Sequence, residues 1–191
     1  QSPLDALRSG ISANYPQLDG NNYDYIVSTK GNLQNIQFRN IHFTNCNVSA
    51  VRDGTYSTYW MGLVNCHFSN VKQAVSCDYI YLYNCYVNYR DTTSYCINGN
   101  STILLNSIFK PTSSTGTLST IASSVSLSAV GNIFIGGVRA LQCEMYNQYY
   151  ANNIFYGQTE AAVKLHYNGT QITSNNIAYL AATSDNMFGS W

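Results

Sequence analysis

The segment MGLVNCHFSN, residues 61–70, contains the pattern that decides the fold: an alternating apolar run, an asparagine and a second alternating run. The same arrangement returns in IYLYNCYVNY, residues 80–89, and IHFTNCNVSA, residues 41–50, resembles both. The asparagines in the fifth position of the three segments are 20 and 19 residues apart. A signature that recurs at such an interval identifies an internal repeat.

The repeat extends through most of the chain. An asparagine or glycine ends each short apolar run, at intervals of 20, 19, 22, 25, 21 and 23 residues. The series is Asn45, Asn65, Asn84, Asn106, Gly131, Asn152 and Asn175. Because the intervals vary while the signature stays, we expect fixed strand positions joined by loops of variable length. This combination predicts a β-solenoid and argues against a helical repeat.

The chemistry of the repeat agrees with this fold. Each coil would lay short strands against those of its neighbours, about 4.8 Å away. Alternate residues would then point inward, Met61 and Leu63 before the asparagine and Cys66 and Phe68 after it. The alternation breaks at Asn65 because a residue in the left-handed conformation bends the chain there, and Asn and Gly adopt that conformation most easily. We expect the stacked asparagine side chains to hydrogen-bond along the column.

The six cysteines fall into the same columns. The predicted stacks are Cys46, Cys66 and Cys85, and Cys77, Cys96 and Cys143, the latter continued by Leu165. We interpret them as small buried apolar residues. Disulfides between adjacent rungs are the alternative, although they strain the usual geometry. Since no C-x-x-C pair or Cys/His cluster occurs, the sequence predicts neither a metal site nor a cofactor.

Composition narrows the choice of partners. The chain has 191 residues with zero formal net charge, and only 9% of them are charged. This low and balanced charge does not indicate nucleic acid or an anionic membrane as a partner. No run approaches the roughly 18 apolar residues of a membrane span, so membrane insertion is not expected. A chain that begins at Gln rather than Met favours a mature protein or a fragment.

The domain organisation follows from where the repeat begins and ends. We expect residues 1–30 to form an N-terminal cap and an irregular first coil, with a short helix that begins near Ser2 and Pro3. Residues 31–180 would form the solenoid, with about 7–8 coils of about 22 residues. Residues 181–191 would form a C-terminal cap or tail.

The asparagine column resembles that of right-handed parallel β-helix proteins of the pectin-lyase-like superfamily, over roughly residues 30–180. The chain looks most like a phage tailspike or receptor-binding spike domain. The resemblance implies an all-β fold and a polysaccharide lyase, a hydrolase, a surface adhesin or a tailspike. The N-T-D, paired D-D, G-H-G and R-I-K motifs of the polygalacturonase-like hydrolases are missing from the sequence, so enzymatic activity stays open.

Candidate catalytic residues come from one outward column. Glu144 and His166 follow Cys143 and Leu165, so we expect them to stack and to be the best acid–base pair. Asp78 belongs to the same column but lies three coils away, about 14 Å by the rung spacing. A polar pair on the surface of the sheet is the alternative interpretation.

Aromatic residues that point outward on a strand, and Tyr59 and Trp60 just before a strand, indicate carbohydrate binding. An aromatic ring packs on a sugar face while amides and hydroxyls bond to its hydroxyls. Three basic residues, Arg52, Lys72 and Arg90, fall six or seven residues after a column asparagine. They would form a basic stripe, either a solvated edge or a docking site for an acidic glycan. The predicted carbohydrate-binding residues are Tyr59, Trp60, Tyr81, Tyr83, Tyr149 and Arg52.

An outward apolar column predicts a partner subunit. The residues two positions after each column asparagine or glycine are Asn47, His67, Tyr86, Ile108, Ile133, Ile154 and Ile177. A monomer seldom exposes such an aliphatic stripe as the last four would form. We expect these four isoleucines to form an oligomer interface, with a homotrimer preferred and a covering loop as the alternative.

These features together predict a spike or adhesin domain that binds a cell-surface polysaccharide or glycan receptor, with cleavage of the glycan left open. The expected location is extracellular or the virion surface. Two alternatives of other classes are a monomeric secreted polysaccharide lyase or glycoside hydrolase, and a structural solenoid shaft without ligand chemistry.

Overall fold

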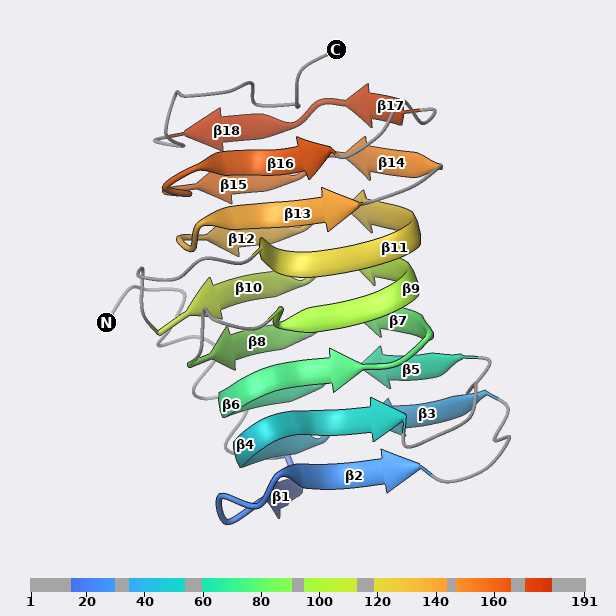
Figure 1. The fold of residues 1–191 in the computed structure, drawn as a ribbon, viewed down its shortest axis with the longest axis vertical. Helices are drawn as coiled ribbons and strands as arrows, with labels where there is room; N and C mark the ends of the chain where they lie inside the picture. The colour runs from blue at the N-terminus through green and yellow to red at the C-terminus, as the bar shows by residue number, and fades with distance from the viewer. Residues whose placement is uncertain are drawn as a thin grey trace.

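A computed structural model of the chain confirms the predicted parallel β-solenoid (Figure 1). It describes residues 15–29, 35–53, 60–90, 95–112, 119–143, 147–165 and 171–179. Eighteen strands join in one continuous sheet, and every pairing among them is parallel. The described residues contain no helix. They form roughly six turns rather than the 7–8 expected, and the predicted capping helix and C-terminal cap lie outside the described residues.

Each turn contributes strand segments to three faces, and the chain climbs along a right-handed path in Figure 1. Face 1 contains β3 (Ile36–Arg39), β5 (Met61–Val64), β7 (Tyr79–Tyr83), the later parts of β9 (Ile97–Leu105) and β11 (Ser119–Val130), β14 (Gln148–Ala151) and β17 (Gln171–Ser174). Face 2 contains β1 (Gln17–Asp19), the early parts of β4 (His42–Asp53) and β6 (His67–Ser76), β8 (Tyr86–Tyr89), β10 (Ile108–Pro111), β12 (Ile133–Ile135), β15 (Ile154–Tyr156) and β18 (Ile177–Tyr179). Face 3 contains β2 (Tyr25–Thr29), the later parts of β4 and β6, the early parts of β9 and β11, β13 (Arg139–Cys143) and β16 (Ala161–Leu165).

The corner between faces 1 and 2 is the predicted left-handed column. Its residues have φ between 49° and 68°, a region that Asn and Gly tolerate best. Asn84 donates a hydrogen bond from Nδ2 to Oδ1 of Asn65 over 2.9 Å, and Asn65 donates to Asn40 over 3.2 Å. The column members are Asn40, Asn65, Asn84, Asn106, Gly131, Asn152 and Asn175.

The first member of this column was predicted wrongly, because it is Asn40 and not Asn45. Phe43 pairs with Phe68, and their rings stack 5.0 Å apart, which fixes the register of the first turn. Asn45 lies at a second left-handed corner, inside β4, where its Oδ1 accepts a hydrogen bond from Asn70 over 2.7 Å. Asn40 and Asn45 both follow a short apolar run and both have positive φ, so the sequence pattern alone does not distinguish them. With Asn40 in the column, His42 replaces Asn47 in the outward column of face 2.

The cysteine columns are corrected in the same way. Cys66 and Cys85 stack as predicted, whereas Cys46 pairs with Val71 in another column. Cys143 pairs with Leu165, but Cys96 lies one position before the Val75–Ile97 pair and is displaced from Cys77. All six thiols are buried and none forms a disulfide, which confirms the buried, unpaired interpretation. Burial raises the pKa of Cys77 to about 12, so this thiol stays protonated at neutral pH.

A second ladder of polar side chains runs inside the same corner. The residue after each corner residue points inward, and in the last turns it is Asn132, Asn153 and Asn176. Asn153 is fully buried; its Nδ2 donates to the backbone carbonyl of Ala129 over 2.8 Å, and its Oδ1 accepts from the backbone N–H of Asn132 over 3.0 Å. Because the corner interrupts the regular ladder, these amides supply the missing partners of backbone groups.

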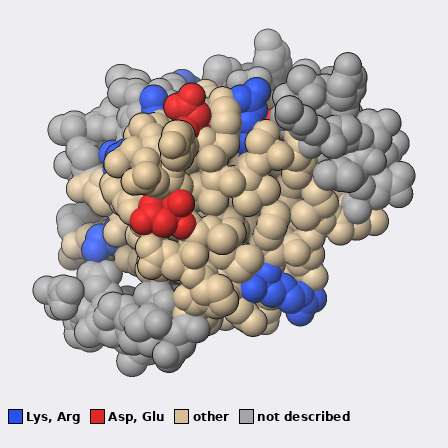
Figure 2. All heavy atoms as spheres, turned by 90° about the horizontal axis from the view of Figure 1, so that it is seen from below, with Lys and Arg blue, Asp and Glu red and all other residues tan. Residues whose placement is uncertain are grey.

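The core between the faces is a set of stacked apolar columns. On face 2 Phe109, Phe134 and Phe155 stack with centroids 5.1 and 5.3 Å apart and planes 9° apart in each pair. On face 1 the inward pairs Met61 with Leu63 and Ile80 with Leu82 are fully buried, as the alternation predicts. Charged side chains are few and scattered on the end of the solenoid seen in Figure 2.

Replacing Asn65 tests the corner. We expect Asn65→Ala to lower the free energy of unfolding in urea by about 1–2 kcal/mol, because alanine is strained at positive φ and both side-chain bonds are lost. Asn65→Gly removes the same bonds without the strain, so it should cost less than alanine. Equal losses for the two variants would show that the left-handed backbone is not what selects asparagine.

Replacing Asn153 tests the inner ladder. Asn153→Ala leaves a buried carbonyl and a buried N–H without partners, so we expect a loss of about 2–4 kcal/mol in the same experiment. Asn98→Ala is the matched control, since Asn98 is exposed on β9 and should change stability by no more than about 0.5 kcal/mol. Similar losses for both variants would contradict the role given to the inner ladder.

Candidate ligand-binding groove

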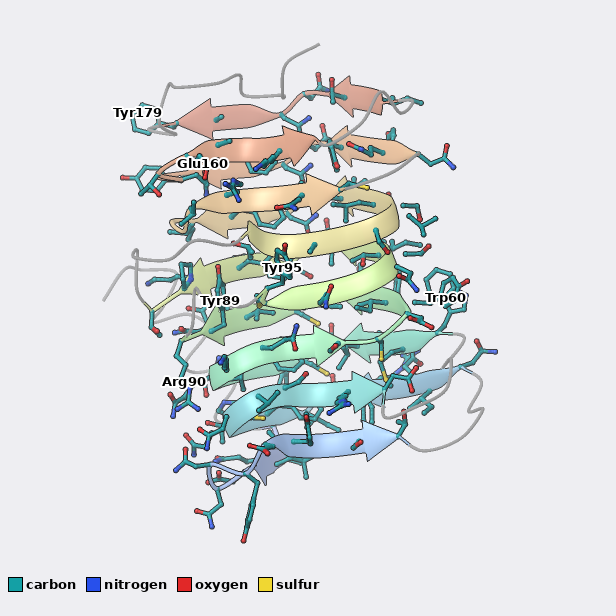
Figure 3. All side chains as sticks on the ribbon, viewed as in Figure 1. Trp60, Tyr89, Arg90, Tyr95, Glu160 and Tyr179 are labelled. Carbon is teal, nitrogen blue, oxygen red and sulfur yellow. The ribbon has the colours of Figure 1, made fainter. Side chains whose placement is uncertain are left out.

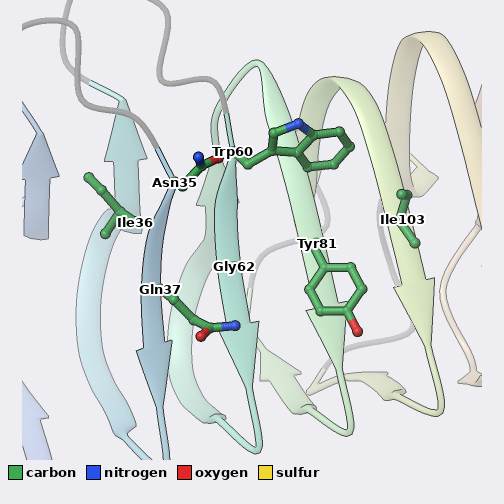
Figure 4. A pocket seen from close by; sticks show the side chains of 7 residues that line it. All are labelled: Asn35, Ile36, Gln37, Trp60, Gly62, Tyr81 and Ile103. Carbon is green, nitrogen blue, oxygen red and sulfur yellow. The ribbon is translucent and has the colours of Figure 1, made fainter.

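A groove of about 440 Å³ lies on the outer surface of face 1, across four neighbouring turns. Trp60 stands at one edge of the solenoid, on the side where β5 begins (Figure 3). The close view in Figure 4 shows its indole beside Tyr81, with Gln37 on the preceding turn. The lining residues are Asn35, Ile36, Gln37, Trp60, Gly62, Tyr81 and Ile103.

The groove exists because one column of face 1 lacks a side chain. Gln37, Gly62, Tyr81 and Ile103 are register partners on successive turns. Gly62 leaves a gap between Gln37 and Tyr81, whose backbones are two rungs apart, about 9.6 Å. A Cβ atom at position 62 would lie 3.3 Å from Cγ of Gln37 and would begin to fill this gap. Glycine in a strand otherwise made of large residues thus keeps the surface open.

The apolar wall of the groove is aromatic. Trp60 is 36% exposed, and its ring lies 5.5 Å from that of Tyr79 at an interplanar angle of 46°. This contact supports the indole from the strand behind it. Tyr81 and Ile103, on the next two turns, extend the apolar surface along the solenoid axis.

The polar wall presents an oriented amide. Arg39 donates a hydrogen bond from Nε to Oε1 of Gln37 over 2.8 Å. Since an arginine has only donors, this bond places the amide oxygen toward Arg39 and leaves the NH₂ group for the groove. Nε2 of Gln37 accordingly lies over Gly62, 3.4 Å from the position a Cβ would take. The arrangement offers a ligand an aromatic face and an amide donor side by side.

The structure brings together part of the predicted carbohydrate-binding set. Trp60 and Tyr81 line the groove, and carbohydrate binding by them stays a prediction. Tyr83 and Tyr149 lie on the same face, 39% and 41% exposed, but they do not line the groove. Tyr59 lies outside the described residues.

Arg52 is separated from this set. It lies on β4 in face 3, where its guanidinium carbon is 4.6 Å from the centroid of the Tyr25 ring and it donates a hydrogen bond to the Tyr25 hydroxyl. Arg90, which was expected in the same basic stripe, donates to the backbone carbonyl of Cys46. Both arginines therefore bond to the solenoid itself, which weakens the case for a basic docking stripe.

The catalytic prediction stays a prediction. Asp78 lies at the turn between faces 3 and 1 and accepts a hydrogen bond from Nδ2 of Asn100 over 2.8 Å. The backbone N–H groups of Asn100 and Ser101 bond to its carbonyl, so Asp78 joins neighbouring turns. Glu144 and His166 lie outside the described residues. Within the part of the chain that the structure describes, no group of three or more His, Cys, Asp or Glu residues could hold a metal ion.

The four isoleucines of the predicted oligomer interface form one column in register. Ile108, Ile133, Ile154 and Ile177 pair in sequence along face 2. Exposure rises along the column, from 5% at Ile108 to 42% at Ile154 and 61% at Ile177. The neighbouring outward column adds Tyr156 and Tyr179, whose rings are stacked 5.9 Å apart.

Sequence reasoning missed the polar half of the groove. A repeat that takes Asn45 as its first corner leaves Gln37 and Asn35 outside the first strand of this face, whereas the register pairs Gln37 with Gly62. Gly62 carried a readable signal, since a glycine between Met61 and Leu63 interrupts a strand of large apolar residues. Its meaning depends on the neighbours in its column, which only the register identifies.

Comparisons with known proteins add no relative. No protein-family model matches the sequence, and neither a curated protein nor a solved structure matches it. No helix in the described part of the chain is long and apolar enough to cross a membrane. Function is therefore inferred from the fold, the groove and the outer surface.

Proposed function

We propose that this chain is a glycan-binding β-solenoid, a spike or adhesin domain similar to the phage tailspikes of the pectin-lyase-like superfamily. It would act outside the cell or on a virion surface and bind a cell-surface polysaccharide. The observation that carries this proposal is the groove of face 1, where Trp60 and Tyr81 lie beside the oriented amide of Gln37.

A sugar suits this groove for physical reasons. The faces of pyranose rings are apolar C–H surfaces that pack on aromatic rings, while their rims carry hydroxyls that need hydrogen-bond partners. The groove offers Trp60 and Tyr81 for the first requirement and the amides of Gln37 and Asn35 for the second. It is open and elongated along four turns, which suits a chain of sugars better than a small compact ligand.

The two alternative functions, an enzyme and a structural shaft, explain the groove less well. A secreted polysaccharide lyase or hydrolase would require acid–base groups at the sugar, for which Glu144, His166 and Asp78 are the candidates. A purely structural shaft would give no reason for the gap at Gly62 beside an exposed tryptophan. Binding is therefore preferred, with cleavage as a separate question.

Truncation of the aromatic wall tests the proposal. On an array of neutral, carboxylated and sulfated glycans, we expect Trp60→Ala and Tyr81→Ala to weaken binding by about 2 kcal/mol, roughly thirtyfold, since central aromatic contacts dominate such sites. Tyr23→Ala is the matched control, because Tyr23 is 72% exposed in the turn between β1 and β2. Unchanged affinity in the groove variants, or an absence of glycan binding, would overturn the proposal.

We also propose that the exposed end of face 2 joins copies of this chain in a homotrimer. Ile154, Tyr156, Ile177 and Tyr179 form two adjacent apolar columns there, and each is at least 42% exposed. An apolar surface of this kind on neighbouring turns favours contact with another protein surface over water. The described strands at this end of the face, β12, β15 and β18, contain no charged residue, and an apolar surface repeated on successive turns suits parallel packing of identical chains.

The mass in solution tests this second proposal. Light scattering on a sizing column should give three times 21.2 kDa for the chain. Ile154→Glu and Ile177→Glu should shift the mass to that of a monomer, because each buries a charge in the interface. Ile172→Glu is the control, since Ile172 is 56% exposed on face 1. A monomeric parent chain, or three variants that behave alike, would contradict the proposal.

A further inference from the structure

We infer that the groove selects a glycan that carries an anionic group, and that Arg39 is the residue that binds this group. This inference rests on the proposed function and names the class of glycan. The sequence pattern did not single out Arg39. It lies at the end of β3, two residues beyond Gln37 on the same outward side of face 1.

The charge of face 1 supports this assignment. The described strand segments of the face contain one charged residue, Arg39, and no Asp, Glu or Lys. The whole chain has nine basic and nine acidic residues, whereas the described strands of this face have one basic residue and no acidic one. Its positive charge is therefore not balanced within the described strands of face 1, where an anion from a ligand would meet no acidic side chain.

The other arginines of the described residues differ in this respect. Arg139 forms a salt bridge with Glu160. Arg52 lies over the Tyr25 ring, and Arg90 bonds to the carbonyl of Cys46. All three are partly buried against the solenoid, whereas Arg39 is exposed. The contacts of those arginines account for them as structural groups, and Arg39 is the one next to the groove.

Geometry joins Arg39 to the site. Its Nε holds Oε1 of Gln37, so the planar guanidinium is fixed in orientation while its two NH₂ groups extend beyond that bond. Nε2 of Gln37 faces the gap above Gly62. The two side chains therefore present donors side by side on the outer surface of β3, with α-carbons about 6.6 Å apart by the strand rise.

The amide donor of Gln37 and the guanidinium of Arg39 together match an acidic sugar. A ring that packs on Trp60 and Tyr81 would offer hydroxyl oxygens to Nε2 of Gln37, and a carboxylate or sulfate at its rim would accept bonds from the guanidinium. Charge-assisted bonds of this type are shorter and stronger than neutral ones. Carboxylate and sulfate share this chemistry, and the experiment separates them.

The test compares glycans that differ only in charge. Hyaluronan oligosaccharides and their carboxyl-reduced forms would be titrated by calorimetry, with a sulfated and a neutral array alongside. We expect the charged form to bind roughly tenfold more tightly, and Arg39→Met to abolish this preference. Arg39→Lys keeps the charge but loses the planar fork, so it should retain part of the preference. The preference should also shrink as salt is raised from 50 to 300 mM.

Arg52→Met is the matched control, because it removes the same charge from face 3 and should leave the preference intact. Preference for sulfated over carboxylated probes would support the anionic class and identify sulfate as the group. Equal, Trp60-dependent binding of charged and neutral probes would overturn the inference and leave the proposed function standing. Binding of no probe would overturn both.

Discussion

The stacking of equivalent residues on neighbouring turns is the constraint on which the whole structure depends. Every backbone hydrogen bond of a strand goes to the turn before or after it, so no turn is stable alone. The left-handed corner sets where each turn begins, through residues such as Asn65 and Asn84. A slip of one residue would move every inward side chain to the outside. Side chains of the same kind therefore stack on neighbouring turns, as Phe134 does on Phe155.

The inner side of that corner shows one requirement met by different chemistries. Asn132 and Asn153 bond to backbone groups with their amides, while at the equivalent position Ser107 donates to the carbonyl of Leu105 over 2.9 Å. In the earlier turns Cys85 and Cys66 take this place, with Sγ of Cys85 3.3 Å from the carbonyl of Leu63. These cysteines are thus more than apolar fillers, since each thiol, a weak donor, lies within reach of a backbone carbonyl.

The same stacking also builds the groove. A solenoid face is a lattice of side chains about 4.8 Å apart in one direction, so one missing side chain becomes a gap with neighbours on both sides. Gly62 supplies the gap, Tyr81 and Gln37 flank it, and Trp60 closes it from the adjacent column. On the described strands of face 1 Arg39 is the one charged residue, so an anionic ligand in the groove would find its counter-charge there.

The sequence by itself determined the parallel β-solenoid, because alternation, left-handed asparagines and regular intervals are local properties of the chain. It also identified Tyr81 as an outward aromatic residue and Trp60, just before a strand, as a second candidate for the binding surface. Only the tertiary structure decided which corner comes first, and with it that Asn40 replaces Asn45 and that Gln37 faces Gly62. Register is a property of two turns and not of one, so motifs five residues apart are distinguished only when the side chains they stack, such as Phe43 on Phe68, are in place.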